Sequence, residues 1–381
     1  MDSLRISLLH PFTPGSVGLK EKMIPKYHSQ PHALALNRLV IEKKYDCYID
    51  YFTSRKFSYI KKHKSLKYRF FPVNYNLRGD HKKWKKQRSR SCLSAYTKSM
   101  PDVTIINMSG HSSDYSFELS KSILSKGKKY IPMLGGQHYT DNDRNRLYYK
   151  NADHILVHTS NQQREMMRLD LFKDLDIRVF PLGVDTQFFK PLANSKNLNH
   201  KRYPELLYVG RIVELKRIHI AIETLSALIK SGYKKARLKI IGPVSSKDYY
   251  NKLTKLVNDN NLMDNVEFIK EKSHIELIPF FQNTDLLMLP SSTETFGMVM
   301  IESMACGTPV AAIDCAGGPA EVIKHNYNGI LTTLDNYSKS IIDYFQNLKL
   351  IESTKNNAMK TVNNNYSIEN TYRVLVRSVN G

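Results

Sequence analysis

The chain has 381 residues, of which 41% are apolar and 24% charged, and its formal net charge is +22. That length allows two or three domains, each with its own core. No stretch approaches the roughly 20 consecutive apolar residues that a membrane-spanning helix needs, so the composition argues against an integral membrane protein. The four cysteines lack CxxC spacing, which argues against a zinc site or a disulfide framework and favours a cytoplasmic protein.

Short apolar runs alternate with helical patterns through the first half of the chain. The first run follows an acidic second residue and ends at Pro11, which is typical of a strand and not of a signal peptide. We expect strands at residues 5–10, 46–52, 103–107, 130–134, 154–158 and 177–180. We expect helices between them at 31–44, 117–126 and 161–171. This order predicts a largely parallel sheet with helices on both faces.

The same alternation begins again after residues 194–203, a polar stretch that is typical of a linker. We expect strands at 205–209, 237–241, 266–269, 285–289, 310–313 and 329–332. We expect helices at 217–231, 246–260, 274–281, 298–305, 319–325, 338–348, 352–364 and 367–379. Two such halves predict an α/β protein with two Rossmann-like, doubly wound domains facing a cleft. We place these domains at 1–195 and 205–365, with a linker at 196–204 and a C-terminal helix at 366–381.

Positive charge is concentrated between residues 51 and 100, where fifteen Lys and Arg stand against one acid, Asp80. The densest part, RGDHKKWKKQRSR, also holds the single tryptophan, Trp84. This basic segment, residues 55–98, would suit an anionic membrane surface, at about 1 kcal/mol per Lys or Arg near anionic lipid. It would also suit the phosphates of a nucleic acid. A solvated basic loop without a partner is the third interpretation.

A strand, a charged turn and the start of an amphipathic helix meet between residues 285 and 309. DLLMLP is typical of a strand buried on both faces, and Glu294, Gly297 and Glu302 follow it at the turn and on the helix. In a doubly wound sheet, ligands bind outside the carboxyl ends of the strands, where a helix N-terminus offers unpaired N–H groups to an anion. Two glutamates at this spacing also occur on ordinary solvated helices.

A second strand end carries two cations. Gly210 follows the predicted strand 205–209, and Arg211 and Lys216 lie five residues apart on the loop to the next helix. Both side chains can therefore converge over the carboxyl edge of the sheet and clamp a diphosphate. A helix start disfavours cations through its macrodipole, which favours a binding role for this pair. The turn CAGGP, 315–319, adds a backbone that can approach a ligand closely.

The order of these segments resembles one family. YVGRIVELK, ETFGMVMIESMACGTPVAA, AGGPAEVI and HNYNGILT resemble the successive donor-site motifs of the family-4 retaining glycosyltransferases with the GT-B fold. In the first half, NADHILVHTSNQQREMM and VFPLGVDTQFFKP also resemble that family, with Leu182 where Asn is usual. The resemblance runs from about residue 100 to the C-terminus. It implies a GT-B fold whose C-terminal helix crosses back to the first domain.

The resemblance implies a UDP- or GDP-linked sugar donor, held mainly by the second domain without a required metal or cofactor. It implies that Arg211 and Lys216 bind the donor diphosphate, that Glu294 contacts the sugar hydroxyls and that Glu302 binds the ribose hydroxyls. His111 lies where the family often places a histidine near the donor sugar, so it joins Glu294, Arg211 and Lys216 as a catalytic candidate. The further donor contacts that it implies are Gly15, Gly210, Thr295, Phe296, Gly297 and Met298.

Several positions depart from the family pattern. Gly15 is isolated where the family shows paired glycines, and Arg217 replaces a common Gly after the lysine. Lys270 or Glu271 replaces the glycine after another strand, which leaves the nucleotide base open. The DxD of residues 141–143 has no strand before it, and we interpret this metal motif of another glycosyltransferase fold as chance.

We therefore expect a retaining glycosyltransferase that moves a hexose or N-acetylhexosamine from a nucleotide sugar to a hydroxyl of a glycan or lipid-linked acceptor in cell-envelope polysaccharide synthesis. It would be cytoplasmic and peripheral on the inner face of the membrane through the basic segment. One alternative is a GT-B glycosyltransferase that acts on nucleic acid. The other is a non-catalytic GT-B ligand-binding protein, against which the intact Arg211, Lys216, Glu294 and Glu302 argue.

Overall fold

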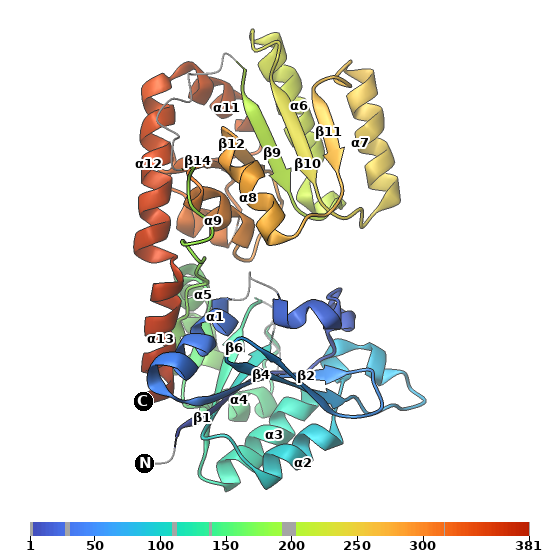
Figure 1. Cartoon of the computed structure of the whole chain (residues 1–381), viewed down its shortest axis with the longest axis vertical. Helices are drawn as coiled ribbons and strands as arrows, with labels where there is room; N and C mark the ends of the chain where they lie inside the picture. Colours follow the sequence, from blue (N-terminus) through green and yellow to red (C-terminus); the bar gives the residue numbers. More distant parts are fainter. Residues whose placement is uncertain are drawn as a thin grey trace. The chain divides into compact units, whose positions relative to one another are not determined.

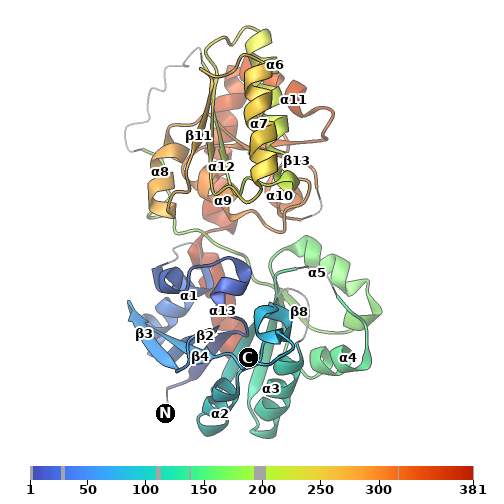
Figure 2. The ribbon, with the colours of Figure 1, turned by 90° about the vertical axis from the view of Figure 1, so that its right-hand side faces the viewer.

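The computed structural model describes residues 3–26, 31–108, 113–136, 139–192, 203–315 and 317–380. The chain divides into two compact units, each a sheet covered by helices (Figure 1, Figure 2). The first unit comprises Met1–Pro181 and Glu369–Gly381, and the second comprises Leu182–Ile368. Within the described ranges, no helix combines the length and the apolar character needed to span a bilayer.

The described part of the first unit has a sheet with strand order β3-β4-β2-β1-β5-β6-β7-β8. Its strands are β1 (Arg5–His10), β2 (Asp46–Thr53), β3 (Tyr59–His63), β4 (Leu66–Pro72), β5 (Val103–Met108), β6 (Lys129–Leu134), β7 (Ile155–Val157) and β8 (Ile177–Val179). Neighbouring strands are parallel except for β3 and β4, which form an antiparallel pair. The chain winds outward from β1 in both directions, so this is the doubly wound order that the sequence predicts.

The helices of the first unit include one from the far end of the chain. They are α1 (Pro31–Arg38), α2 (Arg90–Lys98), α3 (Asp114–Ser125), α4 (Asp143–Lys150), α5 (Ser160–Met167) and α13 (Ile368–Asn380). The helix expected over 31–44 begins where predicted, but its last turn, Leu39–Lys43, is a π-helix. Arg38 of α1 pairs with Glu369 of α13 at 2.7 Å, and the Tyr45 hydroxyl donates to Asn380 Oδ1 at 2.9 Å. These contacts hold the C-terminal helix against the first unit.

The second unit has a sheet that is parallel throughout its described strands, in the order β11-β10-β9-β12-β13-β14. The strands are β9 (Glu205–Val209), β10 (Arg237–Ile241), β11 (Val266–Ile269), β12 (Leu286–Leu289), β13 (Val310–Ile313) and β14 (Gly329–Thr332). The helices are α6 (Ile218–Lys230), α7 (Lys247–Asp259), α8 (His274–Gln282), α9 (Met298–Ala305), α10 (Gly318–Val322), α11 (Tyr337–Gln346) and α12 (Leu348–Asn365). All six strands predicted for this half agree with the structure to within one residue.

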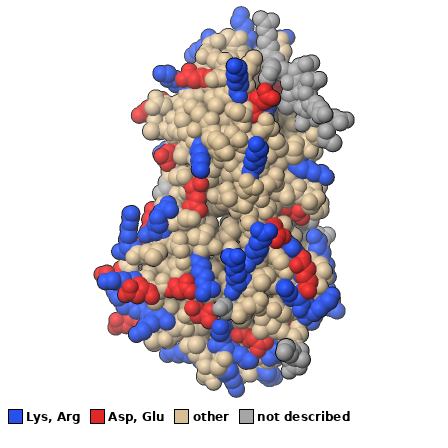
Figure 3. Space-filling view, turned by 90° about the vertical axis from the view of Figure 1, so that its left-hand side faces the viewer, with Lys and Arg blue, Asp and Glu red and all other residues tan. Residues whose placement is uncertain are grey.

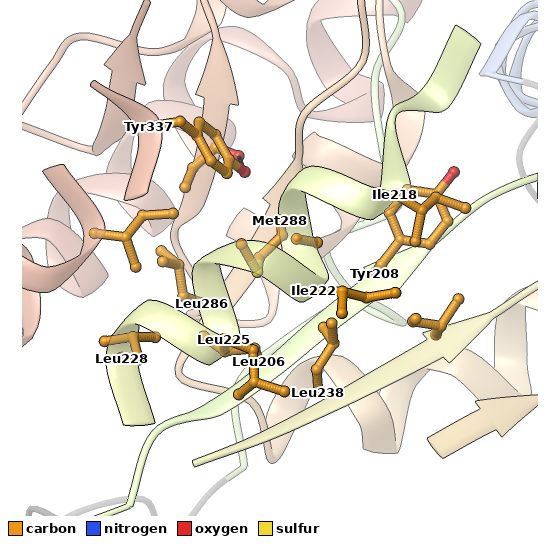
Figure 4. Close-up of a cluster of buried hydrophobic side chains, with 14 of the residues drawn as sticks. Leu206, Tyr208, Ile218, Ile222, Leu225, Leu228, Leu238, Leu286, Met288 and Tyr337 are labelled. Carbon is orange, nitrogen blue, oxygen red and sulfur yellow. Dashed lines mark hydrogen bonds between the residues drawn. The ribbon is translucent and has the colours of Figure 1, made fainter. Parts of the chain in front are cut away.

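The core of the second unit fixes the strands that carry the charged loops. Ile222 and Leu225 of α6 point toward Leu206 of β9 and Leu238 of β10, and all four side chains are buried (Figure 4). Each fully buried aliphatic side chain of this kind contributes about 1.5–3 kcal/mol relative to exposure. The position of β9, and hence of the loop that follows it, is set by this packing.

The basic segment contains more regular structure than a solvated loop would. No strand is predicted there from the sequence, whereas β3 and β4 form a hairpin whose second strand pairs with β2. Along β4, Leu66, Tyr68 and Phe70 are buried between basic residues. The charge of Arg69 is accommodated because its guanidinium makes two hydrogen bonds, of 2.7 and 2.6 Å, to the buried carboxylate of Asp50. Apolar alternation was therefore present but hidden by the density of Lys and Arg.

The two units together are an α/β protein with two Rossmann-like domains, in agreement with the predicted fold class. Most of the predicted linker, residues 196–202, lies outside the described residues.

Candidate active site

Three loops leave the same edge of the second sheet because β9, β12 and β13 are adjacent and parallel. These loops begin after Val209, Leu289 and Ile313, at the carboxyl ends of their strands. The strand order reverses between β9 and β12, since the chain runs from β9 to β10 and β11 and then returns to β12. Such a reversal is where open α/β sheets bind ligands.

Lys216 and Glu294 meet across two of these loops. Lys216 Nζ lies 2.5 Å from Glu294 Oε2, and the side chains are 19% and 15% exposed. The loops are joined a second time by Ser292, whose backbone N–H and hydroxyl both donate to the carbonyl of Leu215, at 3.0 and 3.1 Å. The structure thus brings together the predicted diphosphate lysine and the predicted sugar-binding glutamate.

Glycines of the third loop hold the backbone of Glu294 in place. The N–H of Gly318 donates to the carbonyls of Glu294 and Thr295, at 3.3 and 3.1 Å. A Cβ at Gly317 would lie 1.9 Å from the carbonyl oxygen of Glu294, and one at Gly318 would lie 1.9 Å from that of Phe296. Only glycine permits this approach, so the glycines of the turn at 315–319 shape the site through the backbone of residues 294–296.

Helix α9 starts directly at the turn. Gly297 is its N-cap, with φ 84°, in the left-handed region that glycine adopts without strain. The N–H groups of Met298 and Val299 precede the intrahelical hydrogen bonds and carry the positive end of the helix dipole, whereas the N–H of Met300 already donates to the carbonyl of Gly297 at 2.8 Å. An anion can therefore be bound beside Glu294 and Lys216.

Arg211 lies on the loop after β9 but makes no hydrogen bond or ion pair with Lys216 or Glu294 in the described part of the chain. Gly210 is held there by a hydrogen bond from its N–H to the carbonyl of Ile241, at 3.0 Å. The Tyr208 hydroxyl donates to the backbone carbonyl of Arg211 at 3.0 Å. The Arg211 side chain is exposed, and it enters no ion pair with the described residues. It is therefore available to a ligand.

Arg217 shows why a glycine would suit the position after Lys216. It is the N-cap of α6 with φ 47°, in the left-handed region. A residue with a Cβ is disfavoured there by roughly 1–2 kcal/mol. The departure from the family pattern is therefore tolerated at a cost in backbone strain.

Glu302 lies inside the protein, roughly one and a half turns along α9 from Gly297. Its side chain is 2% exposed, and its Oε1 lies 3.1 Å from Nδ1 of His274, the first residue of α8. Burial alone would lower the pKa of His274, but the adjacent Glu302 carboxylate raises it above the usual value. His274 is not predictable as a site residue from the sequence, since nothing in its local pattern marks it.

The remaining predicted site residues come from the first half of the chain. Gly15 is in a 3-10 turn after β1 in the first unit, and a Cβ there would meet no atom within 4 Å. His111 and the weaker candidate His138 lie outside the described residues. In the DxD of residues 141–143, Asn142 is the N-cap of α4 and its side chain accepts the N–H of Asn145 at 2.9 Å. Among the described residues, no group of three or more His, Cys, Asp or Glu side chains is arranged to hold a metal ion.

Residues 190–364 match the family model described as "Glycosyl transferases group 1". This range lies in the second unit and contains Arg211, Lys216, Glu294 and Glu302. The match therefore covers most of the second unit.

Among curated proteins, a D-inositol 3-phosphate glycosyltransferase of Pseudarthrobacter chlorophenolicus is 33% identical over 187 residues. The alignment covers 47% of this chain and 44% of that protein. The chain spans less than half the length of the curated relatives that it matches.

Solved structures resemble the whole chain. A glycosyltransferase from Rickettsia africae superposes with a TM-score of 0.73 at 16% identity and covers 100% of this chain and 98% of that one. The Anabaena protein HepE in complex with UDP and glucose superposes with a TM-score of 0.69 at 15% identity, covering 99% of this chain and 100% of that one. At these identities the likeness establishes the fold, which is the GT-B fold of glycosyltransferases.

Proposed function

We propose that the protein is a retaining glycosyltransferase that moves a hexose or N-acetylhexosamine from a UDP- or GDP-linked donor to a hydroxyl acceptor. The observation that carries this proposal is the Lys216–Glu294 pair at the N-terminus of α9, within the range that matches the glycosyl transferases group 1 family model. A cation and a helix N-terminus suit a diphosphate, and a carboxylate beside them suits sugar hydroxyls. A ligand-free donor site would keep the two charges satisfied through each other.

In the proposed reaction the bond between the anomeric carbon and the diphosphate oxygen breaks, and a bond from that carbon to the acceptor oxygen forms on the same face. The acceptor proton passes to the departing phosphate. Negative charge grows on the leaving group, where Lys216, Arg211 and the first N–H groups of α9 would stabilise it. These groups replace the charge that a divalent metal would supply, so we propose that no metal is required.

The donor diphosphate would compete with Glu294 for Lys216. When it binds, Lys216 turns from a carboxylate to a phosphate, and Glu294 becomes free to accept hydrogen bonds from the sugar. This exchange keeps a partly buried charge from being left alone at either stage. His111 would contribute at the sugar, and Gly15, Gly210, Thr295, Phe296 and Met298 would line the donor.

The proposal is tested by incubating the protein with a panel of UDP- and GDP-sugars and extracts of lipid-linked and glycan acceptors, and by following transfer with mass spectrometry. Retention is read from the anomeric configuration of the product. Inositol phosphate belongs in the acceptor panel because a curated relative is named as a D-inositol 3-phosphate glycosyltransferase. Nucleotide binding without transfer or donor hydrolysis would favour a non-catalytic binding protein.

We also propose that the basic segment binds an anionic membrane, which would place the protein at the inner face of the membrane, near lipid-linked acceptors of cell-envelope polysaccharide synthesis. Phe57 is 80% exposed beside Arg55 and Lys56, and the fully exposed Leu77 precedes Arg78. Exposed apolar side chains beside cations suit the boundary between lipid headgroups and acyl chains. On the face drawn in Figure 3, by contrast, basic side chains are interspersed with acidic ones.

Cosedimentation with vesicles of phosphatidylserine and phosphatidylcholine, compared with phosphatidylcholine alone, tests the membrane proposal. Phe57→Ser with Leu77→Ser should weaken sedimentation at constant charge. If vesicle binding is unaffected by these two substitutions and is lost only at high salt, and if the protein also shifts DNA in a gel, the nucleic-acid alternative would be supported. If neither result is obtained, the lysines of the edge strand β3 are best explained as protection against edge-to-edge pairing of sheets.

A further inference from the structure

Helices α8 and α9 bring a histidine to a buried carboxylate. Glu302 is 2% exposed, and the group within ion-pair distance of it among the described residues is His274, 3.1 Å away and 28% exposed. A carboxylate taken out of water needs a counter-ion or hydrogen bonds to remain ionised. Cys306 directly follows α9, and burial together with the nearby charge of Glu302 raises the pKa of its thiol to about 12, so this thiol stays neutral.

The position of His274 is fixed by the start of its helix. Ser273 is the N-cap of α8 in a capping box, in which its N–H donates to Glu276 Oε2 at 2.9 Å. Glu276 is turned toward this cap and toward Lys272, 3.8 Å away, and it makes no ion pair with His274 in the described structure. The N-terminus of a helix disfavours a protonated histidine, so the positive charge on His274 depends on Glu302.

We propose that His274 is a positioning residue for Glu302, holding this carboxylate in the orientation in which it can accept hydrogen bonds from the ribose hydroxyls of the donor nucleotide. This inference rests on the proposed function. The imidazole contacts Glu302 at Oε1, which leaves the second oxygen of the carboxylate for the ligand. His274 would therefore act on donor binding through Glu302 and not on the transfer step.

The pairing itself is tested in the free protein, independently of any donor. Histidine side-chain NMR follows the protonation of His274, with its signal assigned from its loss in His274→Ala. Glu302→Gln should lower the pKa of His274, because the group that raises it is removed. An unchanged pKa would overturn the proposal, whatever the outcome for glycosyl transfer.

The effect on binding is tested with UDP and GDP by calorimetry, and with the active nucleotide sugar by kinetics. His274→Ala should raise the Kd of the nucleotide and the KM of the donor by about tenfold, because a misplaced Glu302 carboxylate would make one fewer hydrogen bond to the ribose. The kcat should stay near that of the wild type. His274→Arg should restore binding. The wild-type affinity should decline as pH rises through the pKa of His274, and His274→Arg should remove this decline.

The matched control is His219→Ala. His219 also lies in the first turn of a helix in the second unit, but its ring contacts the Tyr249 hydroxyl at 2.9 Å. His219→Ala should leave the Kd of the nucleotide and the KM of the donor unchanged. Equal Kd values for the wild type and His274→Ala would overturn the positioning role. A wild-type protein that binds neither nucleotide would overturn the proposed function and the ribose role with it, and the NMR titration would still decide the pairing.

Discussion

Lys216 Nζ lies 2.5 Å from Glu294 Oε2 although 78 positions separate the residues in the chain, because β9 and β12 are neighbours in the sheet. Both side chains are mostly buried at the N-terminus of α9. The pair is therefore a product of the fold, and each member constrains where the other lies. Its chemistry is open to a direct test, since the two members are expected to serve different parts of the donor.

Lys216→Ala should lower kcat by roughly 100-fold or more, the effect of removing one preorganised group that stabilises developing negative charge. Urea unfolding measured alongside separates this effect from any loss of stability. Lys252→Ala is the matched control, because that lysine pairs at 3.3 Å with Glu214 where both side chains are more than two-thirds exposed. Wild-type turnover in purified, folded Lys216→Ala would contradict the diphosphate role.

Gly317→Ala should destabilise the protein by about 1–3 kcal/mol and weaken nucleotide binding. Its φ is 125°, and a Cβ there would lie 1.9 Å from the Glu294 carbonyl oxygen, so the turn that positions Glu294 must shift. Urea denaturation and calorimetric titration with UDP and GDP measure the two effects. For stability, Gly15→Ala is the control, since a Cβ at that position meets nothing within 4 Å. Equal stability of the two variants would contradict the close approach.

Local patterns were sufficient to predict the frame of the second unit. Helix α9 has the predicted bounds, because an apolar helical repeat lies between Gly297 and Gly307. The buried parallel strands of the second unit were equally predictable, as short apolar runs between turns. Where these strands end was thus predictable, whereas the adjacency of β9 and β12 that brings Lys216 to Glu294 is seen only in the structure.

Tertiary pairing decided what the sequence could not predict. β4 was missed because the charge of Arg69 is neutralised by Asp50 on a neighbouring strand, a relation that a local pattern does not contain. His274 was missed for the same reason, since it acquires its partner Glu302 only when α8 packs against α9. In both cases a partly buried basic side chain is paired with a buried carboxylate, whereas sequence patterns assign such side chains to the surface.

The stability of the protein should fall as pH decreases below about 6.5, in part because of buried histidines in the first unit. Burial and the nearby His158 lower the pKa of His32 to about 3, and burial lowers the pKa of His158 to about 4. The unfolded chain binds protons at the ordinary pKa of 6.5 while the folded chain does not. These histidines therefore leave the free energy of unfolding at its full value above pH 6.5, and that free energy falls progressively as pH decreases toward 4.

Urea unfolding between pH 4.5 and 7.5 measures this loss, which amounts to at most about 1.4 kcal/mol per pH unit for each histidine. His158→Gln should flatten the dependence, because glutamine fills a similar volume without titrating. His219→Gln serves as the comparison, since that ring lies in the second unit against Tyr249. Parallel curves for the wild type and His158→Gln would show that His158 does not contribute.

Asp50→Ala should destabilise the protein by about 3–5 kcal/mol, the cost of leaving a buried charge unpaired. Asp50 is fully buried and accepts hydrogen bonds from Arg69 and, at 2.7 Å each, from the hydroxyls of Ser7 and Tyr96. Arg69→Met should be similarly costly because it leaves the Asp50 carboxylate without its cation. The double variant Asp50→Leu with Arg69→Met should cost less than the sum of the two single changes, since both buried charges are then absent.

The control for this network is Asp176→Ala, which breaks a 2.6 Å pair with Arg178 whose side chains are 49% and 37% exposed. An exposed pair of this kind contributes at most about 1 kcal/mol. The Asp50–Arg69 and Asp176–Arg178 pairs have the same 2.6 Å contact, so they differ in burial and not in distance. Urea denaturation of the four variants at pH 7 therefore measures how burial of the pair changes the free energy of unfolding. If Asp50→Ala were as stable as Asp176→Ala, the Asp50–Arg69 pair would not be what holds the basic β4 strand against β2.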